Sequence, residues 1–268
     1  MRQKDFPSAL ILLLLVGIAS QRLAVTQWTT RLELVLLLAI MGAVLGLVLG
    51  ISQFRRGVIT LLATIYSLVV VPFTQAGFLL RGEAWLERMS QLGGRLLGSL
   101  SIVAGGEPLE DPFLLLFIFS TGFWFIGLSS GYWLTRKGSF LGAVLPSGII
   151  IIVMQLFHTR STAGTILTSV FVFLLLLLLG RMNYSRKREA WRKWSVFPTG
   201  EARVDINLTI LIGTALLVLT AWLLPVSSRQ IPLLREWWPE MPRLRQRSES
   251  LRNTFAGPEE DDGTPINK

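Results

Sequence analysis

FVFLLLLLL, residues 171–179, is an unbroken run of apolar side chains inside a longer apolar stretch at 162–182. A helix needs about 20 mostly apolar residues to cross the ~30 Å hydrocarbon core of a bilayer, and this stretch meets that requirement. Because an unpaired backbone N–H or C=O group is costly in lipid, an apolar stretch of this length is expected to form a helix rather than a strand. The run therefore predicts a transmembrane helix.

Apolar stretches of similar length are spread over most of the chain. Of its 268 residues, 51% are hydrophobic and only 16% are charged, a balance that is unusual for a soluble domain of this size. The sequence predicts an all-α, polytopic membrane protein with about seven transmembrane helices. The predicted spans are 8–25, 34–52, 58–80, 113–135, 140–157, 162–182 and 206–224.

Some of these spans allow a second interpretation. The first follows a basic start and ends in the small-residue segment GIAS at 17–20, so it also resembles a secretory signal peptide that would be cleaved. The third contains Pro72 and Gln75, and the fifth contains Pro146. We expect kinked helices there, since neighbouring helices can satisfy the carbonyl groups that a proline leaves free.

The distribution of Lys and Arg predicts the orientation of the spans. If the N-terminus is cytoplasmic, the inside segments contain Arg55-Arg56, Arg136-Lys137 and the basic cluster at 181–203, and their cations outnumber those of the outside segments. The tail after 224 is also rich in cations, which a simple count would place inside. Long segments are exported largely regardless of charge, so we expect the N-terminus inside and the C-terminus outside.

The same pattern divides the chain into regions. Residues 1–225 are the predicted transmembrane domain, with a basic cytoplasmic loop at 183–204. At about 82–104, apolar residues recur at helical spacing with charged residues between them, which indicates an amphipathic helix. It could cover a substrate entrance, but we expect an interfacial helix between two spans. Residues 226–256 are a predicted extracytoplasmic juxtamembrane linker helix, and the acidic, Gly- and Pro-containing tail 257–268 is predicted to be disordered.

Glycines repeat at four-residue spacing in two of the predicted spans. Gly42, Gly46 and Gly50 lie on one face of the second span, and Gly127 and Gly131 repeat the pattern in the fourth. Small residues at this spacing let two helix backbones approach closely. The pattern is compatible with a homodimer interface or with packing inside one monomer, and we favour the second.

A segment that combines cations with two tryptophans directly follows the span at 162–182. Such a composition occurs in nucleic-acid-binding and in lipid-binding segments. Its position on the predicted cytoplasmic side favours binding of anionic headgroups, with the indole rings at the interface, and we expect no nucleic-acid partner. The predicted lipid-headgroup anchor is Arg186, Lys187, Arg188, Trp191, Arg192, Lys193 and Trp194.

The sequence offers little that could support catalysis. It has no cysteine and a single histidine, His158, and it contains no nucleotide-binding, zinc-protease or hydrolase motif. Acidic residues are almost absent from the predicted spans, whereas ion-coupled transporters typically place them there. We expect no catalytic, metal or cofactor site. Arg22, Gln75 and Gln155, near span ends, are expected to snorkel or to lie at the interface.

Several features from residue 111 onward point to a family. They are DPF at 111–113, Trp124 and Gly127 in the span that follows, Tyr132-Trp133 at its far end, the basic segment 186–194, and AWLLP at 221–225. In this arrangement the chain resembles the N-terminal membrane region of the bacterial membrane-anchored transglutaminase-like family. The resemblance implies several helices followed by an exported papain-like domain. The chain contains no cysteine, so the family's Cys/His/Asp triad cannot be assembled from it and no functional residue is carried over.

The resemblance leads to the first functional hypothesis, a non-catalytic membrane-anchoring scaffold in the bacterial cytoplasmic membrane. The chain would be either a truncated product or one partner of a split gene, with an exported transglutaminase-like domain encoded separately. The alternative is a small permease or transporter subunit, in which Pro72 and Pro146 mark broken helices along a substrate path. Buried polar side chains that converge near the bilayer midplane would favour the alternative.

Overall fold

The computed structural model of the protein describes residues 6–26, 31–79, 84–104, 113–157, 162–193 and 200–223. All of them belong to one compact unit, Met1–Leu223. The predicted linker helix and tail fall in the second unit, Leu224–Lys268, which lies outside the described residues.

The described residues form helices and contain no strand. A π-helical turn, η1, follows directly on α5 and ends at Gly138, which has a left-handed backbone conformation with φ 57°. The helices are α1 (Phe6–Ala24), α2 (Glu33–Ile51), α3 (Arg56–Leu79), α4 (Trp85–Ala104), α5 (Phe113–Tyr132), η1 (Trp133–Lys137), α6 (Phe140–Phe157), α7 (Thr162–Lys193) and α8 (Gly200–Leu223).

Five segments are long and apolar enough to cross a membrane: α1, α2, Arg56–Gly77 of α3, α5 with η1, and Thr162–Lys187 of α7. The other two predicted spans correspond to α6 and α8, whose described apolar parts, Phe140–Gln155 and Leu208–Thr220, are shorter. Large apolar side chains also cover the outside of the unit: Leu61 and Leu68 of α3 are 60% and 71% exposed. In water such a surface would be a large apolar patch. The chain is therefore an all-α protein suited to a membrane.

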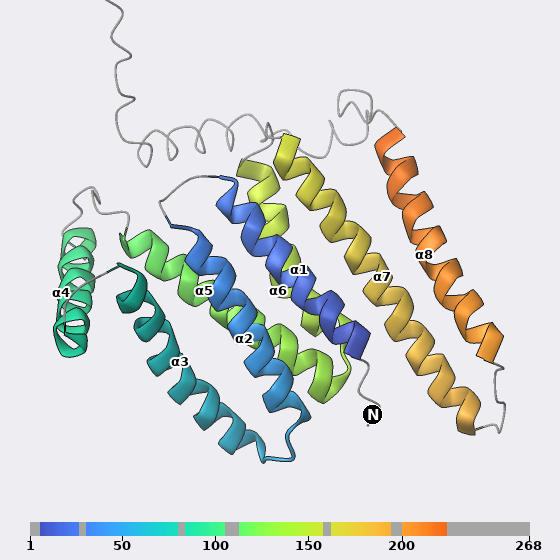
Figure 1. Ribbon diagram of the computed structural model, residues 1–268, viewed down its shortest axis with the longest axis horizontal. Helices are drawn as coiled ribbons and strands as arrows, with labels where there is room; N and C mark the ends of the chain where they lie inside the picture. Colours follow the sequence, from blue (N-terminus) through green and yellow to red (C-terminus); the bar gives the residue numbers. More distant parts are fainter. Residues whose placement is uncertain are drawn as a thin grey trace, which may run out of the picture. The chain divides into compact units, whose positions relative to one another are not determined.

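Successive apolar helices run in alternating directions, apart from α4 (Figure 1). α1, α3, α6 and α8 point one way, whereas α2, α5 and α7 point the other way. α3 and α5, the two helices that flank α4, therefore run in opposite directions. α2 and α5 run in the same direction. We call the end of the unit where α1 begins the lower end, and the other end the upper end.

α1 lies at the centre of the core. Leu12, Leu15, Val16 and Leu23 have no exposed surface, and α1 packs against α2, α5, α6 and α7. Cleavage within the segment that resembles a signal peptide would therefore remove a central element of the packed unit.

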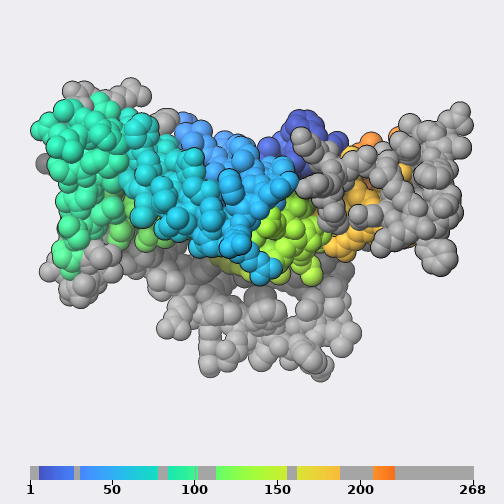
Figure 2. Space-filling view, turned by 90° about the horizontal axis from the view of Figure 1, so that it is seen from below, coloured from blue at the N-terminus to red at the C-terminus, as the bar shows by residue number. Residues whose placement is uncertain are grey.

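α4 occupies the region where an amphipathic helix is predicted. One face carries the buried Leu92, which packs with Ala76 of α3 and Phe113 of α5. The opposite side exposes Leu86 and Leu97 by 82% and 72%. In the space-filling view the atoms of α3 and α4 adjoin each other at one side of the unit (Figure 2). α4 thus covers the upper ends of α3 and α5 with one apolar face and leaves apolar side chains on its other side.

α7 is longer than its apolar stretch. It has 32 residues and continues through the basic segment to Lys193, so most of the region predicted as a loop at 183–204 is helical, and α8 begins at Gly200. At 1.5 Å per residue α7 is about 48 Å long, more than the ~30 Å of hydrocarbon that a span must cross. The surplus is the basic lower end of the helix. The helix can continue there because long Lys and Arg side chains have good helix propensity.

Candidate functional site

The tightest contact in the unit is between α2 and α5. A Cβ added to Gly42 would overlap the carbonyl oxygen of Trp124, and one added to Gly46 would overlap that of Leu128. A Cβ on Gly127 would lie 2.8 Å from the backbone nitrogen of Ala43, closer than real Cβ atoms come. Only glycine leaves room for the two backbones at these points. We call this contact the glycine seam, and its members are Gly42, Gly46, Gly50, Gly127 and Gly131.

The glycine seam lies within one chain. Each of its glycines on α2 meets α5 or η1, and each on α5 meets α2. Because the α2 and α5 backbones fill this face for each other, it is not open to a second copy in the described unit. The geometry matches the monomer-packing interpretation of the repeat.

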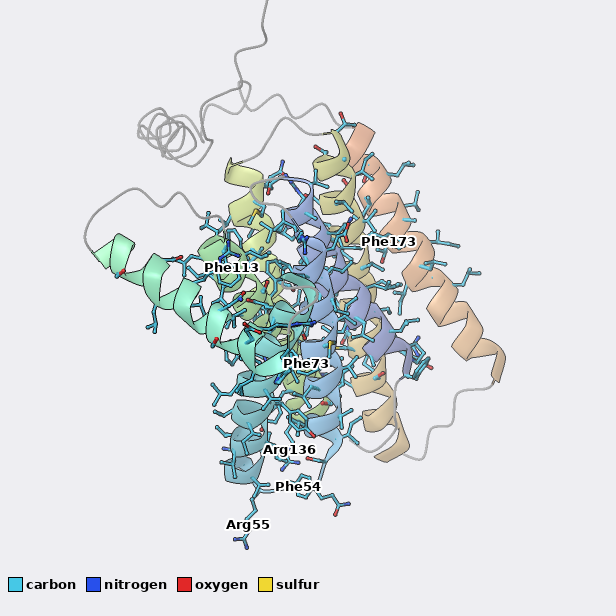
Figure 3. All side chains as sticks on the ribbon, turned by 60° about the vertical axis from the view of Figure 1, so that its left-hand side comes forward. Phe54, Arg55, Phe73, Phe113, Arg136 and Phe173 are labelled. Carbon is cyan, nitrogen blue, oxygen red and sulfur yellow. The ribbon has the colours of Figure 1, made fainter. Side chains whose placement is uncertain are left out.

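At the lower end, basic side chains hold the ends of other helices. Arg136 donates from Nη1 to the carbonyl oxygen of Ser52 (2.6 Å) and from Nη2 to that of Phe54 (3.1 Å). Ser52 directly follows α2, and the last carbonyl groups of a helix have no donor within it. Arg136 therefore provides hydrogen-bond donors for carbonyl groups just after the end of α2. In Figure 3, Arg136 lies next to Phe54 and near Arg55.

Arg186 of α7 makes a similar contact. Its Nη2 donates to the carbonyl oxygen of Gly138, at 2.9 Å, where η1 ends. The segments that carry Arg55, Arg136 and Arg186 thus meet at one end of the unit, although they are far apart in the sequence. Among the described residues, this end thus brings together Arg55, Arg136 and Arg186, which the sequence assigns to the cytoplasmic side.

The predicted lipid-headgroup anchor is only partly within the described side chains. Arg186 and Lys187 are exposed, and one guanidinium nitrogen of Arg186 donates a hydrogen bond to the carbonyl oxygen of Gly138. Arg188 to Lys193 continue α7, but their side chains, like all of Trp194, lie outside the described part. His158 also lies outside it.

The turn between α5 and α6 contains a second cation contact. The ammonium group of Lys137 lies 3.4 Å from the centre of the Trp133 ring. A Cβ on Gly142 of α6 would come within 2.8 Å of the same ring. The indole is therefore packed between α6 and a cation, a geometry that is favourable because the ring face is electron-rich.

The position of Arg22 differs from the prediction that its side chain snorkels or lies at the interface. Its side chain has no exposed surface, so it does not snorkel to water but is enclosed within the helices. Its guanidinium lies against Gly164 of α7, where an added Cβ would fall 2.5 Å from Cζ. Near this point the hydroxyl of Thr168 on α7 donates to the carbonyl oxygen of Gly164, at 2.9 Å, and Oε1 of Gln155 on α6 lies 3.4 Å from the same hydroxyl as a second, more distant acceptor. Polar groups of α1, α6 and α7 thus gather at the upper end.

The burial of Gln75 also differs from the prediction that this side chain lies at the membrane interface. It is fully buried on α3, and neither its Oε1 nor its Nε2 atom has a hydrogen-bond partner. Ser120 on α5 is likewise fully buried with an unpartnered Oγ. Between α3 and α5, Nε1 of Trp124 donates to Oγ of Ser67, at 2.7 Å, and Ser67 in turn donates to a backbone carbonyl of α3. The contact between α3 and α5 therefore contains a buried side-chain hydrogen bond, and we call it the polar contact between α3 and α5.

The sequence contains a partial signal for this polar contact. Ser67, Val71 and Gln75 recur every four residues on α3, which places them on one face of the helix. What the sequence does not show is which helix this face meets, and so the pairing with Trp124 could not be derived from it.

Comparisons with protein-family models, curated proteins and solved structures each found no match to this chain. In the part of the chain that the structure describes, no group of three or more His, Asp or Glu side chains is placed to hold a metal ion. The candidate sites are therefore the glycine seam, the basic lower end and the polar contact between α3 and α5.

Proposed function

We propose that this chain is a seven-span protein of the bacterial cytoplasmic membrane, with its N-terminus inside and its C-terminal region outside. In this proposal it is a non-catalytic scaffold that anchors a separately encoded, exported transglutaminase-like domain. The observation that carries the scaffold role is the glycine seam, because backbone-to-backbone packing of this kind cannot slide or open without separating α2 from α5. A rigid core suits an anchor better than it suits a protein that must alternate between open states.

The orientation is supported by the basic lower end. Arg136 and Arg186 bring three cation-bearing segments together, and alternating helix directions place the start of α1 at the same end. Cytoplasmic segments are those enriched in Lys and Arg. The orientation of α8 then directs residue 223 to the opposite side.

Single-cysteine labelling tests the topology cleanly, because the chain contains no cysteine of its own. Gln53→Cys lies between α2 and α3 at the basic end, and Ser248→Cys lies in the region after α8. With a membrane-impermeant maleimide on intact cells, we expect labelling at position 248 only, and labelling at 53 only after lysis. Labelling at 53 in intact cells would refute the orientation.

The anchoring role is tested by purification from native membranes in a mild detergent. We expect a co-purifying polypeptide with an exported domain that contains a Cys/His/Asp triad. A purified chain without such a polypeptide, under conditions that keep other membrane complexes intact, would speak against a scaffold of this kind.

The second candidate function, a small permease subunit, is favoured by the polar contact between α3 and α5. Pro72 lies within α3, where it removes a helical hydrogen bond, and the unpartnered Gln75 follows less than one turn later. A water-filled path would make Ser120→Cys reactive toward small water-soluble thiol reagents. A scaffold would leave this position protected, as a cysteine at the neighbouring buried Phe123 should be in both cases.

A further inference from the structure

The lower end of the unit carries exposed cations that no described carboxylate balances. Lys137 of η1 and Arg186 and Lys187 of α7 are exposed, and within the part of the chain that the structure describes none of the three forms an ion pair. The acidic side chains among the described residues are Glu33 and Glu87, which lie in the first turns of α2 and α4 and not at this end. Charges of one sign that gather without a counterion attract anions.

These cations lie at the depth of lipid headgroups. Two of the segments that can cross a membrane, Phe113–Lys137 and Thr162–Lys187, have a lysine as their last residue at the lower end. At 1.5 Å per residue they are about 38 and 39 Å long. The hydrocarbon core of a bilayer is ~30 Å thick and the bilayer with its headgroups ~40–45 Å, so segments of this length extend into the headgroup layer.

Two contacts hold cations of η1 and α7 at one turn of the backbone. Nη2 of Arg186 donates to the carbonyl oxygen of Gly138, at 2.9 Å, and Gly138 directly follows Lys137. The ammonium group of Lys137 lies 3.4 Å from the centre of the Trp133 ring, in the preceding turn. Both cations are therefore held in place by η1, and groups that are already ordered lose less entropy when they bind a ligand.

The remaining donors of these cations select an anion with several oxygen atoms. A guanidinium group has five N–H donors in a fork that matches the oxygens of a phosphate, and the bond to Gly138 leaves most of the donors of Arg186 for a ligand. An ammonium group adds donors and a second positive charge. At headgroup depth, the anion that meets these groups is the phosphate of a phospholipid.

We propose that Lys137 and Arg186 form a binding site for the phosphate group of an anionic phospholipid, which we call the η1–α7 site. It differs from the predicted lipid-headgroup anchor, which follows α7 alone, because it includes a cation of η1 and a guanidinium fixed by Gly138. The site requires only that the lower end lies at a membrane surface. It is therefore independent of the proposed orientation and of the scaffold role.

Lipid titration of the full chain tests the site. The chain is purified in a neutral detergent at high salt, which screens charges that do not contact the lipid, and is titrated with dioleoylphosphatidylglycerol while native mass spectrometry counts the bound molecules. Dioleoylphosphatidylcholine is the control lipid, because its choline cation balances the same phosphate. We expect tighter binding of phosphatidylglycerol, and a loss of about tenfold in its affinity in Lys137→Gln and in Arg186→Gln, as the removal of a charge-assisted hydrogen bond predicts.

Lys187→Gln is the matched control. Lys187 is the neighbour of Arg186 on the same helix and is also exposed, but it makes no contact with η1 among the described residues. We expect its affinity for phosphatidylglycerol to fall by about twofold at most under screening salt. A loss equal to that of Arg186→Gln would show that a diffuse basic surface, and not a site, attracts the lipid, and would overturn the proposal.

A double variant and a conservative variant complete the test. Residues that hold one phosphate are coupled, so Lys137→Gln with Arg186→Gln should lower the affinity by less than the product of the two single losses. Arg186→Lys keeps the charge and removes the fork, so we expect a partial loss, a result that remains informative if Arg186→Gln does not fold. Independent effects of the two substitutions, or displacement of phosphatidylglycerol by inorganic phosphate, would contradict a lipid site at η1 and α7.

Discussion

The glycine seam predicts a sharp difference between two glycines of the same helix. In Gly127→Ala the new Cβ would overlap the carbonyl oxygen of Ala39 and lie 2.8 Å from the nitrogen of Ala43, both backbone atoms of α2. In Gly122→Ala the new Cβ meets nothing within 4 Å. The two changes add the same methyl group to the same helix, so Gly122→Ala is a matched control.

The expected difference in the free energy of unfolding between the two variants follows from two opposing contributions. Alanine is favoured over glycine within a helix by about 0.8–1.0 kcal/mol, a gain that both variants share. Overpacking costs typically 1–3 kcal/mol, and the upper part of this range applies at Gly127 because backbone atoms cannot rotate away as a side chain can. The shared gain cancels, so the difference between the variants is the cost of overlap, about 2–3 kcal/mol. For a chain of this size 1 kcal/mol corresponds to about 2–4 °C in Tm.

We expect Gly127→Ala to unfold on the order of 5–10 °C below Gly122→Ala. The assay is thermal unfolding of both purified variants in the same detergent, followed by intrinsic tryptophan fluorescence, with the fraction of monodisperse protein after heating as a second measure. Trp124 on α5 lies in the seam and is one of nine tryptophans, so the summed signal follows unfolding of the chain as a whole. Equal Tm values for the two variants would refute the close approach of α2 and α5.

Three other substitutions test the remaining contacts. Arg136→Gln should lower the free energy of unfolding by about 1 kcal/mol, because the two hydrogen bonds from Arg136 to the end of α2 are solvent-exposed and thus weaker than buried ones. Arg55→Gln is the control and should leave the free energy of unfolding unchanged. Denaturant titration in detergent compares the two variants. Trp124→Phe removes the hydrogen bond to Ser67 and should cost about 1 kcal/mol beyond its lost area, and this excess should vanish in a Ser67→Ala background. Gly164→Ala crowds the buried guanidinium of α1 and should reduce the yield of folded protein in size-exclusion chromatography, which an unchanged yield would contradict.

The helices were accessible to sequence reasoning because lipid imposes a simple rule. Every backbone group must be satisfied internally, so an apolar stretch such as FVFLLLLLL at 171–179 has helix as its only stable form. The ends of helices obey no such rule. α7 continues to Lys193 because basic residues are good helix formers, while hydropathy registers only the loss of apolar character after Met182.

The pairing of helices was predictable only where small residues mark it. Glycines at four-residue spacing indicate that a helix face meets another backbone, but α2 and α5 are separated by two helices in the sequence, and nothing in the spacing names the partner. Arg136 and Arg186 show the same limit. Their charge suggests a topological role, whereas their hydrogen bonds to Ser52, Phe54 and Gly138 depend on loops that only the fold brings together.

A buried amide is the feature that sequence reasoning places least well in a membrane protein. Gln75 follows Pro72 near the end of an apolar stretch, where a polar residue is cheapest if it reaches the interface, and hydropathy therefore favours an exposed position. The fold instead covers this end of α3 with α4, an amphipathic helix whose apolar face rests on Ala76 and Phe113. The cost of burying Gln75 thus arises from a contact between helices rather than from α3 itself. Gln75 therefore lies in the interior although its sequence position favours the interface, because the neighbouring helices and not α3 alone decide its burial.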